Sequence, residues 1–187
     1  MLVTGPPASG KTFVAELVAD RLGVPLIAKD AIKETLFETL GSGDVAWSQQ
    51  LGRATLALMY RALEAHLKAR QPVIVEANFA AEDAHPRFRA LDERHPLKPL
   101  ELHCTAPADV LLARYAARAG TRHPGHLDAE RMPGIASAVC AGRYRPLGLT
   151  SDGLVIVDTT SFDDVDTAGL VQAARDHLGD RGFEPVG

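Results

Sequence analysis

Hydrophobic positions along the chain fall into short continuous runs separated by longer segments of helical periodicity. Runs of this length that are apolar on both faces are typical of buried strands in a parallel sheet. We therefore predict five strands, at residues 2–4, 24–28, 72–77, 100–104 and 154–158.

The segments between these runs repeat their apolar residues at intervals of three and four, the spacing of one helix face. They predict helices at residues 13–22, 31–40, 45–69, 81–94, 106–119, 135–144 and 165–178. The stretch 120–132 is polar and interrupted by Gly and Pro, so we expect it to be irregular. Alternating strands and helices predict an α/β fold, with a parallel sheet covered by helices on both faces.

Composition limits the possible classes of protein. The 187 residues, 46% of them hydrophobic, are expected to form a single domain over 1–187. A net charge of −4 gives no bulk attraction to nucleic acid or an anionic membrane, and no apolar run is long enough to span a bilayer. The first predicted strand leaves no room for a cleavable signal peptide, and Cys104 and Cys140 form no C-x-x-C pair. We expect a reduced, cytoplasmic protein.

The most specific motif follows the first strand and reads G-x-x-x-x-G-K-T. Its residues are Gly5, Pro6, Pro7, Ala8, Ser9, Gly10, Lys11 and Thr12. Small residues let successive backbone N–H groups face the phosphates of a nucleotide, and the next helix adds its N-terminal partial charge. Lys11 would reach the β- and γ-phosphates, and the Thr12 hydroxyl would help to hold Mg²⁺. The alternative is a plain turn that caps a helix.

Asp30 follows the second strand, where its carboxylate could face the γ-phosphate and accept a proton from an attacking hydroxyl. It could also serve as the N-cap of the next helix, and both roles could hold together. Lys33 lies one turn further along and could contact a phosphate or the substrate, or simply be solvated.

Glu76 ends the most apolar strand, where an unpaired carboxylate needs a cation, a donor or water. Two interpretations are equally supported: a water-mediated contact to Mg²⁺, and a hydrogen bond to a loop or the substrate. Asn78 and Phe79 follow at the same rim and could line the pocket for the phosphoryl acceptor.

Arg114, Arg118 and Arg122 recur every four residues, which predicts one helix stripe leading into a Gly/Pro-hinged segment. Such a segment could act as a lid that brings positive charge to a transferring phosphoryl group. The alternative is a solvated helix face. Further cations, Arg143 and Arg145, could contribute from the following helix. A zinc site at His123 and His126 is not expected, because no acidic or Cys ligand accompanies them.

Together these segments resemble the small P-loop kinases, in particular the group of chloramphenicol phosphotransferase, zeta-toxin-like kinases and the 5′-hydroxyl polynucleotide kinase domain. The resemblance implies a P-loop NTPase three-layer sandwich with a five-stranded parallel sheet of order 2-3-1-4-5. It also implies ATP and Mg²⁺ on the loop, acceptor-binding helices at about 30–70 and an Arg-bearing helical lid at about 114–145. An Asp after the second strand serves in that family as base or orienter, and Asp30 matches this position.

The resulting prediction is an ATP-dependent kinase that transfers the γ-phosphoryl group to a hydroxyl of a small molecule, such as an antibiotic, a nucleoside or a sugar. In it Lys11, Asp30, Arg118 and Arg122 are catalytic, while Arg114 contacts the nucleotide. Asp30, Lys33, Glu76 and Asn78 contact the substrate, and Thr12 and Glu76 serve the metal.

Three alternatives remain: a polynucleotide kinase, a zeta-toxin-like kinase, and an ATP-binding switch without productive transfer. The acidic total and 5% aromatic content disfavour a nucleic-acid acceptor. No N-K-x-D guanine motif is present, so ATP is the expected donor. Neither the acceptor nor the oligomeric state follows from the sequence.

Overall fold

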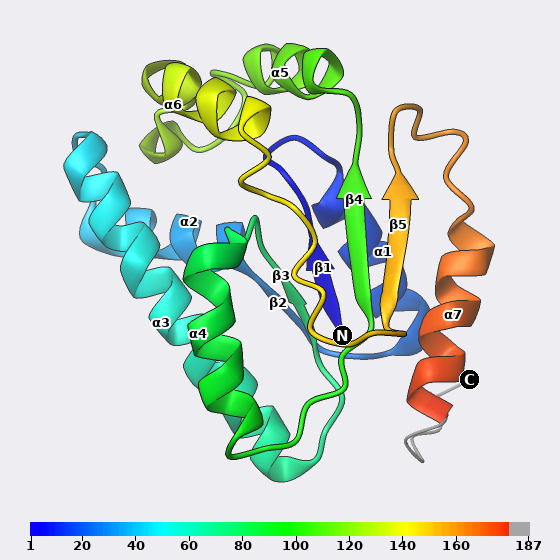
Figure 1. The fold of residues 1–187 in the computed structure, drawn as a ribbon. Helices are drawn as coiled ribbons and strands as arrows, with labels where there is room; N and C mark the ends of the chain where they lie inside the picture. The colour runs from blue at the N-terminus through cyan, green and yellow to red at the C-terminus, as the bar shows by residue number, and fades with distance from the viewer. Residues whose placement is uncertain (180–187) are drawn as a thin grey trace.

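Five parallel strands form a single sheet in the computed structural model, which describes residues 1–179 (Figure 1). The strands are β1 Leu2–Thr4, β2 Leu26–Ala28, β3 Ile74–Glu76, β4 Glu101–Thr105 and β5 Leu154–Asp158. Their order across the sheet is β2-β3-β1-β4-β5. The parallel sheet and the implied strand order are thus confirmed.

Helices connect the strands in the alternating order that the hydrophobic pattern predicts. They are α1 Lys11–Leu22, α2 Lys29–Leu40, α3 Val45–Ala69, α4 Ala81–Asp92, α5 Ala108–Ala117, α6 Asp128–Cys140 and α7 Thr167–Gly179, with a 3₁₀ turn η1 at Pro124–His126. Figure 1 shows α1 and α7 on one face of the sheet and α3 and α4 on the other. The described residues therefore form the three-layer arrangement of the predicted fold class.

Two apolar cores lie on the opposite faces of the sheet because successive strand residues point in opposite directions. Val3 and Ile74 pack with α1 and α7, whereas their neighbours Leu2 and Val75 pack with α3 and α4. At the edge strand β5 the cover is incomplete, since Leu154 is 39% and Ile156 55% exposed. Helices thus cover both faces of the sheet, as predicted, and the cover thins at this edge.

The boundaries of α5 and α6 differ from the predicted ones. Helix α5 ends at Ala117, so Arg118 is its C-cap and Arg122 lies in the following loop. Helix α6 begins at Asp128, seven residues before the predicted start, and contains Pro133. Proline removes one backbone donor but still allows helical φ, so Pro133 and the following Gly134 do not end the helix.

The carboxyl ends of the parallel strands meet at one edge of the sheet, beneath α5 and α6 (Figure 1). The loop after β1, the start of α2 and the residues after β3 all lie at this edge. Such an edge is where ligands bind in open α/β sheets. No helix within residues 1–179 is long and apolar enough to cross a membrane.

Candidate active site

The loop between β1 and α1 approaches its neighbours so closely that two of its glycines are required. At Gly5, φ is +140°, and a Cβ atom would lie 2.2 Å from the carbonyl oxygen of Cys104. At Gly10, φ is +74°, and a Cβ atom would lie 2.3 Å from the ring of Phe162. Ala8 also has a positive φ of 65°, a strained conformation typical of functional loops. Gly10 caps α1 without a side-chain hydrogen bond, which leaves the first N–H groups of the helix for an anion.

The buried ammonium of Lys11 lies 3.6 Å from Oε1 of Glu76, at the end of β3. Burial raises the pKa of Glu76, and the charge of Lys11 opposes that rise. The second carboxylate oxygen, Oε2, is buried without a hydrogen-bond partner among the described residues. An orphaned carboxylate oxygen next to the phosphate loop suits a hydrated cation or a donor on the substrate, so both predicted roles of Glu76 stay predictions.

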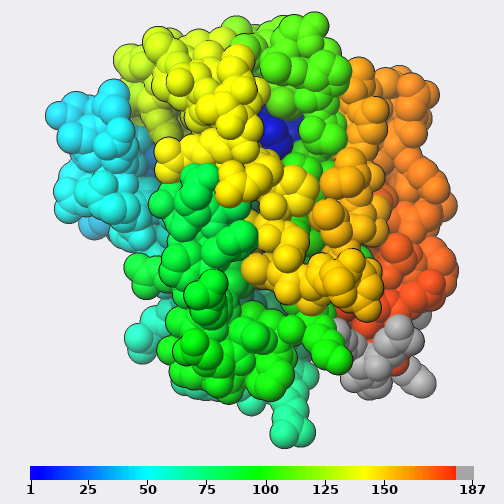
Figure 2. All heavy atoms as spheres, viewed as in Figure 1, coloured from blue at the N-terminus to red at the C-terminus, as the bar shows by residue number. Residues whose placement is uncertain are grey.

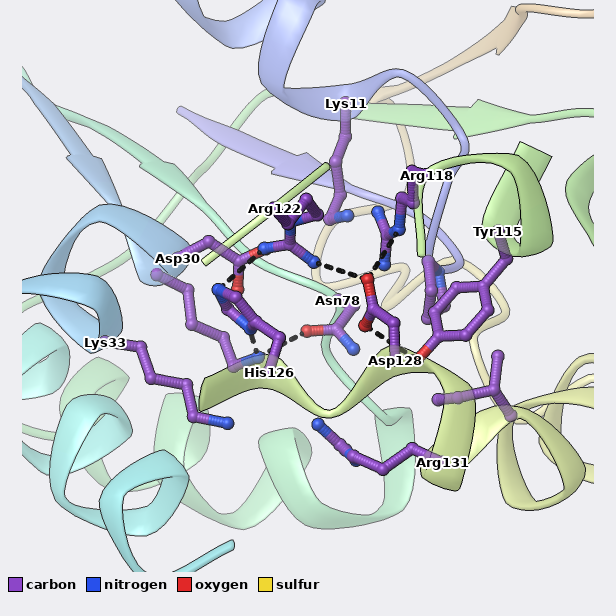
Figure 3. A pocket seen from close by; sticks show the side chains of 13 residues that line it. Lys11, Asp30, Lys33, Asn78, Tyr115, Arg118, Arg122, His126, Asp128 and Arg131 are labelled. Carbon is purple, nitrogen blue, oxygen red and sulfur yellow. Dashed lines mark hydrogen bonds and ion pairs between the residues drawn. The ribbon is translucent and has the colours of Figure 1, made fainter. Parts of the chain in front are cut away.

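Asp30 lies in the first turn of α2 and projects into the pocket below the loop (Figure 3). Its predicted N-cap role is wrong, because the N-cap is Ala28 and no side chain caps the helix. Burial alone would raise the pKa of Asp30, but the charges of Lys29, Lys11 and Arg122 together hold this pKa well below its usual value. The carboxylate is therefore ionised in the free protein.

Arg118 and Arg122 converge on the carboxylate of Asp128, although they do not share a helix stripe (Figure 3). Nε of Arg118 and Nη1 of Arg122 lie 3.3 and 3.6 Å from Oδ2 of Asp128, and Tyr115 donates to Oδ1 at 2.9 Å. Nη2 of Arg122 also donates to Asp30 at 2.7 Å. Asp128 thus aims both arginines at the pocket, a role that the sequence did not suggest.

Arg114 points elsewhere, so the predicted single stripe of three arginines is wrong. Its guanidinium donates to the carbonyls of Thr159 and Thr160 at 2.9 and 3.0 Å and lies 4.4 Å from the ring centre of Phe162. Because Phe162 covers Gly10, Arg114 borders the phosphate loop from the β5 side. Its assignment to the nucleotide stays a prediction.

The segment around η1 is anchored to α2 and α3. The buried ring of Phe37 stacks on His123 at 5.2 Å and lies against Gly125. The carbonyl of Gly125 accepts a hydrogen bond from Ser48 at 2.9 Å. Nε2 of His126 lies 2.9 Å from Arg122 and 2.8 Å from Glu34, so it either accepts from the arginine or donates to the carboxylate. These contacts fix η1, within the predicted lid, against α2 and α3.

Lys33 is 2% exposed, which rules out the solvated alternative. It donates to Ser48 at 3.0 Å. Asn78 accepts from Lys29 at 2.8 Å and lines the pocket, as predicted from its place after β3. Phe79 does not line it, because its ring packs in a core cluster with Tyr60 and Phe88.

The lid arginines that follow α6 lie outside the pocket. Arg143 pairs with Asp83 and Arg145 with Glu82, both at 2.8 Å and both at the surface. No group of three His, Cys, Asp or Glu side chains suited to a metal occurs within residues 1–179. Tyr115, Asp128 and Arg131 also line this pocket, although sequence reasoning did not assign them to a site. Asp128 could have been identified from the sequence by one feature: it is a carboxylate that opens a helix directly after a loop rich in Arg and His.

Thus one pocket joins the phosphate loop, the start of α2, the rim after β3 and the lid. Figure 2 shows N-terminal residues, in blue, in a hollow between the atoms of the lid. Of the predicted residues, Lys11, Asp30, Lys33, Asn78, Arg118 and Arg122 line the pocket, together with Pro7. Glu76 does not line the pocket but pairs with Lys11, and Arg114 does not line it either but contacts the carbonyl of Thr159.

Comparisons with known proteins identify the family and the fold. Residues 1–139 match a protein family described as the AAA domain. A solved structure of a presumed kinase from Chloroflexus aurantiacus J-10-fl is 35% identical, with a TM-score of 0.84 over 94% of this chain and 97% of that chain. No curated protein sequence matches the chain.

More distant solved structures share the fold. A gluconokinase from Sinorhizobium meliloti 1021 is 21% identical, with a TM-score of 0.56 over 96% of this chain and 90% of its own. A shikimate kinase from Bacteroides thetaiotaomicron is 19% identical, with a TM-score of 0.53 over 95% and 96%. The chain therefore belongs to the AAA domain family and has the fold of the small P-loop kinases.

Proposed function

We propose that the protein is a kinase that transfers the γ-phosphoryl group of ATP to a hydroxyl of a small molecule. The observation that carries the proposal is the shared pocket, in which Lys11 of the phosphate loop faces Asp30 of α2 and the lid arginines. Phosphoryl transfer depends on positioning and on charge stabilisation, and this pocket offers both.

The donor side is formed by the loop and the lid. Backbone N–H groups of the loop and the ammonium of Lys11 hold the β- and γ-phosphates. Arg118 and Arg122, oriented by Asp128, balance the charge that develops on the transferring group. Arg122 now pairs with Asp30, and it would exchange this carboxylate for the γ-phosphate when ATP enters.

The acceptor side is formed by α2 and the rim after β3. Asp30 orients the acceptor hydroxyl and takes its proton as the oxygen bonds to the γ-phosphorus. The bond from that phosphorus to the bridging oxygen breaks, and ADP leaves with the electron pair. The products are ADP, the phosphate ester and one proton, which Asp30 passes to solvent.

The residues present fit Mg²⁺, as the orphaned Oε2 of buried Glu76 indicates. Thr12, exposed in the first turn of α1, would bind the ion directly, and Glu76 would hold a water on it. When bound, Mg²⁺ would supply positive charge that offsets the negative charge of the nucleotide phosphates.

The test is ATP consumption by wild type and Lys11→Ala across a panel of antibiotics, nucleosides and sugar-like alcohols, with products identified by mass spectrometry. We expect phosphorylated product from wild type and none above background from Lys11→Ala. Slow ATP loss that no acceptor accelerates, without phosphorylated product, would instead favour a nucleotide-dependent switch.

A further inference from the structure

Two cations in the pocket lack a carboxylate partner. The ammonium of Lys33, although buried, donates to the Ser48 hydroxyl and lies 5.1 Å from the centre of the Phe37 ring, and it makes no ion pair within residues 1–179. The guanidinium of Arg131, from α6, makes no hydrogen bond or ion pair with residues 1–179, and only its backbone N–H is bonded, to the carbonyl of Leu127. A buried charge without a counter-ion is costly, so its retention needs a reason.

The nearby acids are already engaged by other cations. Asp30 pairs with Arg122, and Asp128 pairs with both Arg118 and Arg122. Glu34 contacts His126 and Arg122. The pocket lining therefore holds six Lys and Arg side chains against two carboxylates, those of Asp30 and Asp128.

The unpaired cations lie on the acceptor side. In Figure 3 the nitrogen ends of Lys33 and Arg131 point toward one another from α2 and α6, with Asp30 and Asn78 between them and Lys11. Burial, together with the charges of Lys29 and Arg131, lowers the pKa of Lys33 to about 8, and the charge of Asp30 only partly opposes this fall. Nucleotide phosphates on the loop would thus leave these two cations uncompensated.

A purely structural role does not explain this pair. The hydrogen bond from Lys33 to Ser48 joins α2 to α3, but a neutral donor could make it without burying a charge. The guanidinium of Arg131 links no two elements by a hydrogen bond or ion pair within the described residues. What the two share is an opening between them that is suited to an anion.

We propose that the acceptor carries, besides the hydroxyl that is phosphorylated, a carboxylate or phosphate group that binds between Lys33 and Arg131. This inference rests on the proposed kinase function and narrows its substrate class to anionic alcohols. Asp30 then lies between the anion-binding pair and the phosphate loop, where it can reach a hydroxyl of the anchored molecule.

The test compares alcohols in matched pairs, D-gluconate and sorbitol 6-phosphate against sorbitol, and glycerate against glycerol. The full chain is assayed with ATP and Mg²⁺, and each probe is also titrated calorimetrically into protein saturated with MgADP, so that the loop is occupied. We expect anionic members to bind and the neutral ones not to. The carboxylate and phosphate arms show which anion is preferred.

The key variant is Arg131→Gln, because Arg131 is partly exposed and its loss leaves the core intact. We expect it to weaken binding of the preferred anion, or raise its KM, about tenfold or more, with kcat and the KM for ATP little changed. Arg61→Gln, which removes an exposed arginine of α3, is the matched control and should change neither.

Two results would overturn the inference: neutral members that bind or react as well as anionic ones, or an anion affinity that Arg131→Gln leaves unchanged. Failure of all the anionic probes to bind the MgADP complex at millimolar concentration would also overturn it. Transfer to neutral alcohols alone would leave the kinase function standing without the anion site. Anion binding that depends on Arg131, with no transfer to any alcohol, would leave the anion site standing without the kinase function.

Discussion

Asp30 is held ionised by three neighbouring cations, which makes it a good hydrogen-bond acceptor but a weak base in the free protein. ATP would occupy Lys11 and Arg122, and the added negative charge would raise the pKa of Asp30 toward that of a useful base. The carboxylate therefore gains basicity only when the donor is present.

We expect Asp30→Asn to lower kcat about 10²-fold or more, because the amide cannot accept the proton. The KM for ATP should change less than about threefold, since Asp30 does not hold the phosphates. Steady-state kinetics with a phosphorylated acceptor measure both values. Asp20→Asn, at an exposed position of α1, is the control, and an unchanged kcat in Asp30→Asn would remove Asp30 from the mechanism.

Lys33 should destabilise the free protein. Its pKa falls from 10.5 in the unfolded chain to about 8 in the folded one, chiefly through burial. Between about pH 8 and 10.5 the unfolded chain keeps a proton that the folded chain releases, so the free energy of unfolding rises with pH across this window. Below pH 8 the buried charge costs on the order of 3 kcal/mol.

Lys33→Met should therefore raise the free energy of unfolding at pH 7 by about 1–3 kcal/mol, with the gain shrinking toward pH 10. Urea denaturation at several pH values measures this effect. Lys68→Met, at an exposed lysine of α3, should stay within about 0.5 kcal/mol of wild type. A destabilised Lys33→Met at pH 7 would mean that the charge is compensated within the fold.

At the scale of elements, the lid depends on the contact between η1 and α2. A Cβ atom at Gly125 would lie 2.7 Å from the ring of Phe37, which is itself fully buried. We expect Gly125→Ala to displace η1, destabilise the protein by about 1–3 kcal/mol and raise the acceptor KM. Thermal unfolding and kinetics check these changes.

Gly134→Ala provides the matched control, since a Cβ atom there meets nothing within 4 Å and α6 should gain about 0.5–1 kcal/mol. Equal behaviour of the two variants would show that the packing of Gly125 on Phe37 does not hold the lid.

The strands and the phosphate loop could be predicted because their signals are local. An apolar run marks each strand, and the motif from Gly5 to Thr12 is contiguous, although the close contacts at its two glycines come from Cys104 and Phe162. The convergence of Arg118 and Arg122 could not be predicted, because it depends on where the chain turns after α5. In this turn Leu127 has a φ of 52°, a conformation that is rare for leucine and that its identity does not predict.

Contacts between side chains that lie far apart in the sequence could not be predicted either. Asp30 meets Arg122, and Lys33 approaches Arg131, only after α2 and the lid close over the same pocket. Sequence reasoning placed Lys33 on a helix and judged its charge from that helix alone. Its burial depends on Ser48 and Phe37, which no local pattern connects to it.

At the scale of the whole molecule, a chain of net charge −4 brings six of its 20 Lys and Arg side chains into one pocket. Ligands that bind only the folded state stabilise it by mass action. We expect MgADP at about a hundred times its Kd to add about 2.7 kcal/mol to the free energy of unfolding. In Lys11→Ala this gain should largely vanish, whereas equal stabilisation of both proteins would place the nucleotide elsewhere. Thermal-shift titrations measure it.

The most direct measurement follows the γ-phosphoryl group itself. ATP carrying oxygen-18 in that group is incubated with an anionic alcohol and either wild type or Asp30→Asn, and all phosphate species are resolved by mass spectrometry. We predict that wild type delivers the labelled group to the alcohol as a phosphate ester and that Asp30→Asn largely fails to do so. Label recovered only as free phosphate, at a rate that no alcohol changes, would contradict the assignment of this pocket to phosphoryl transfer.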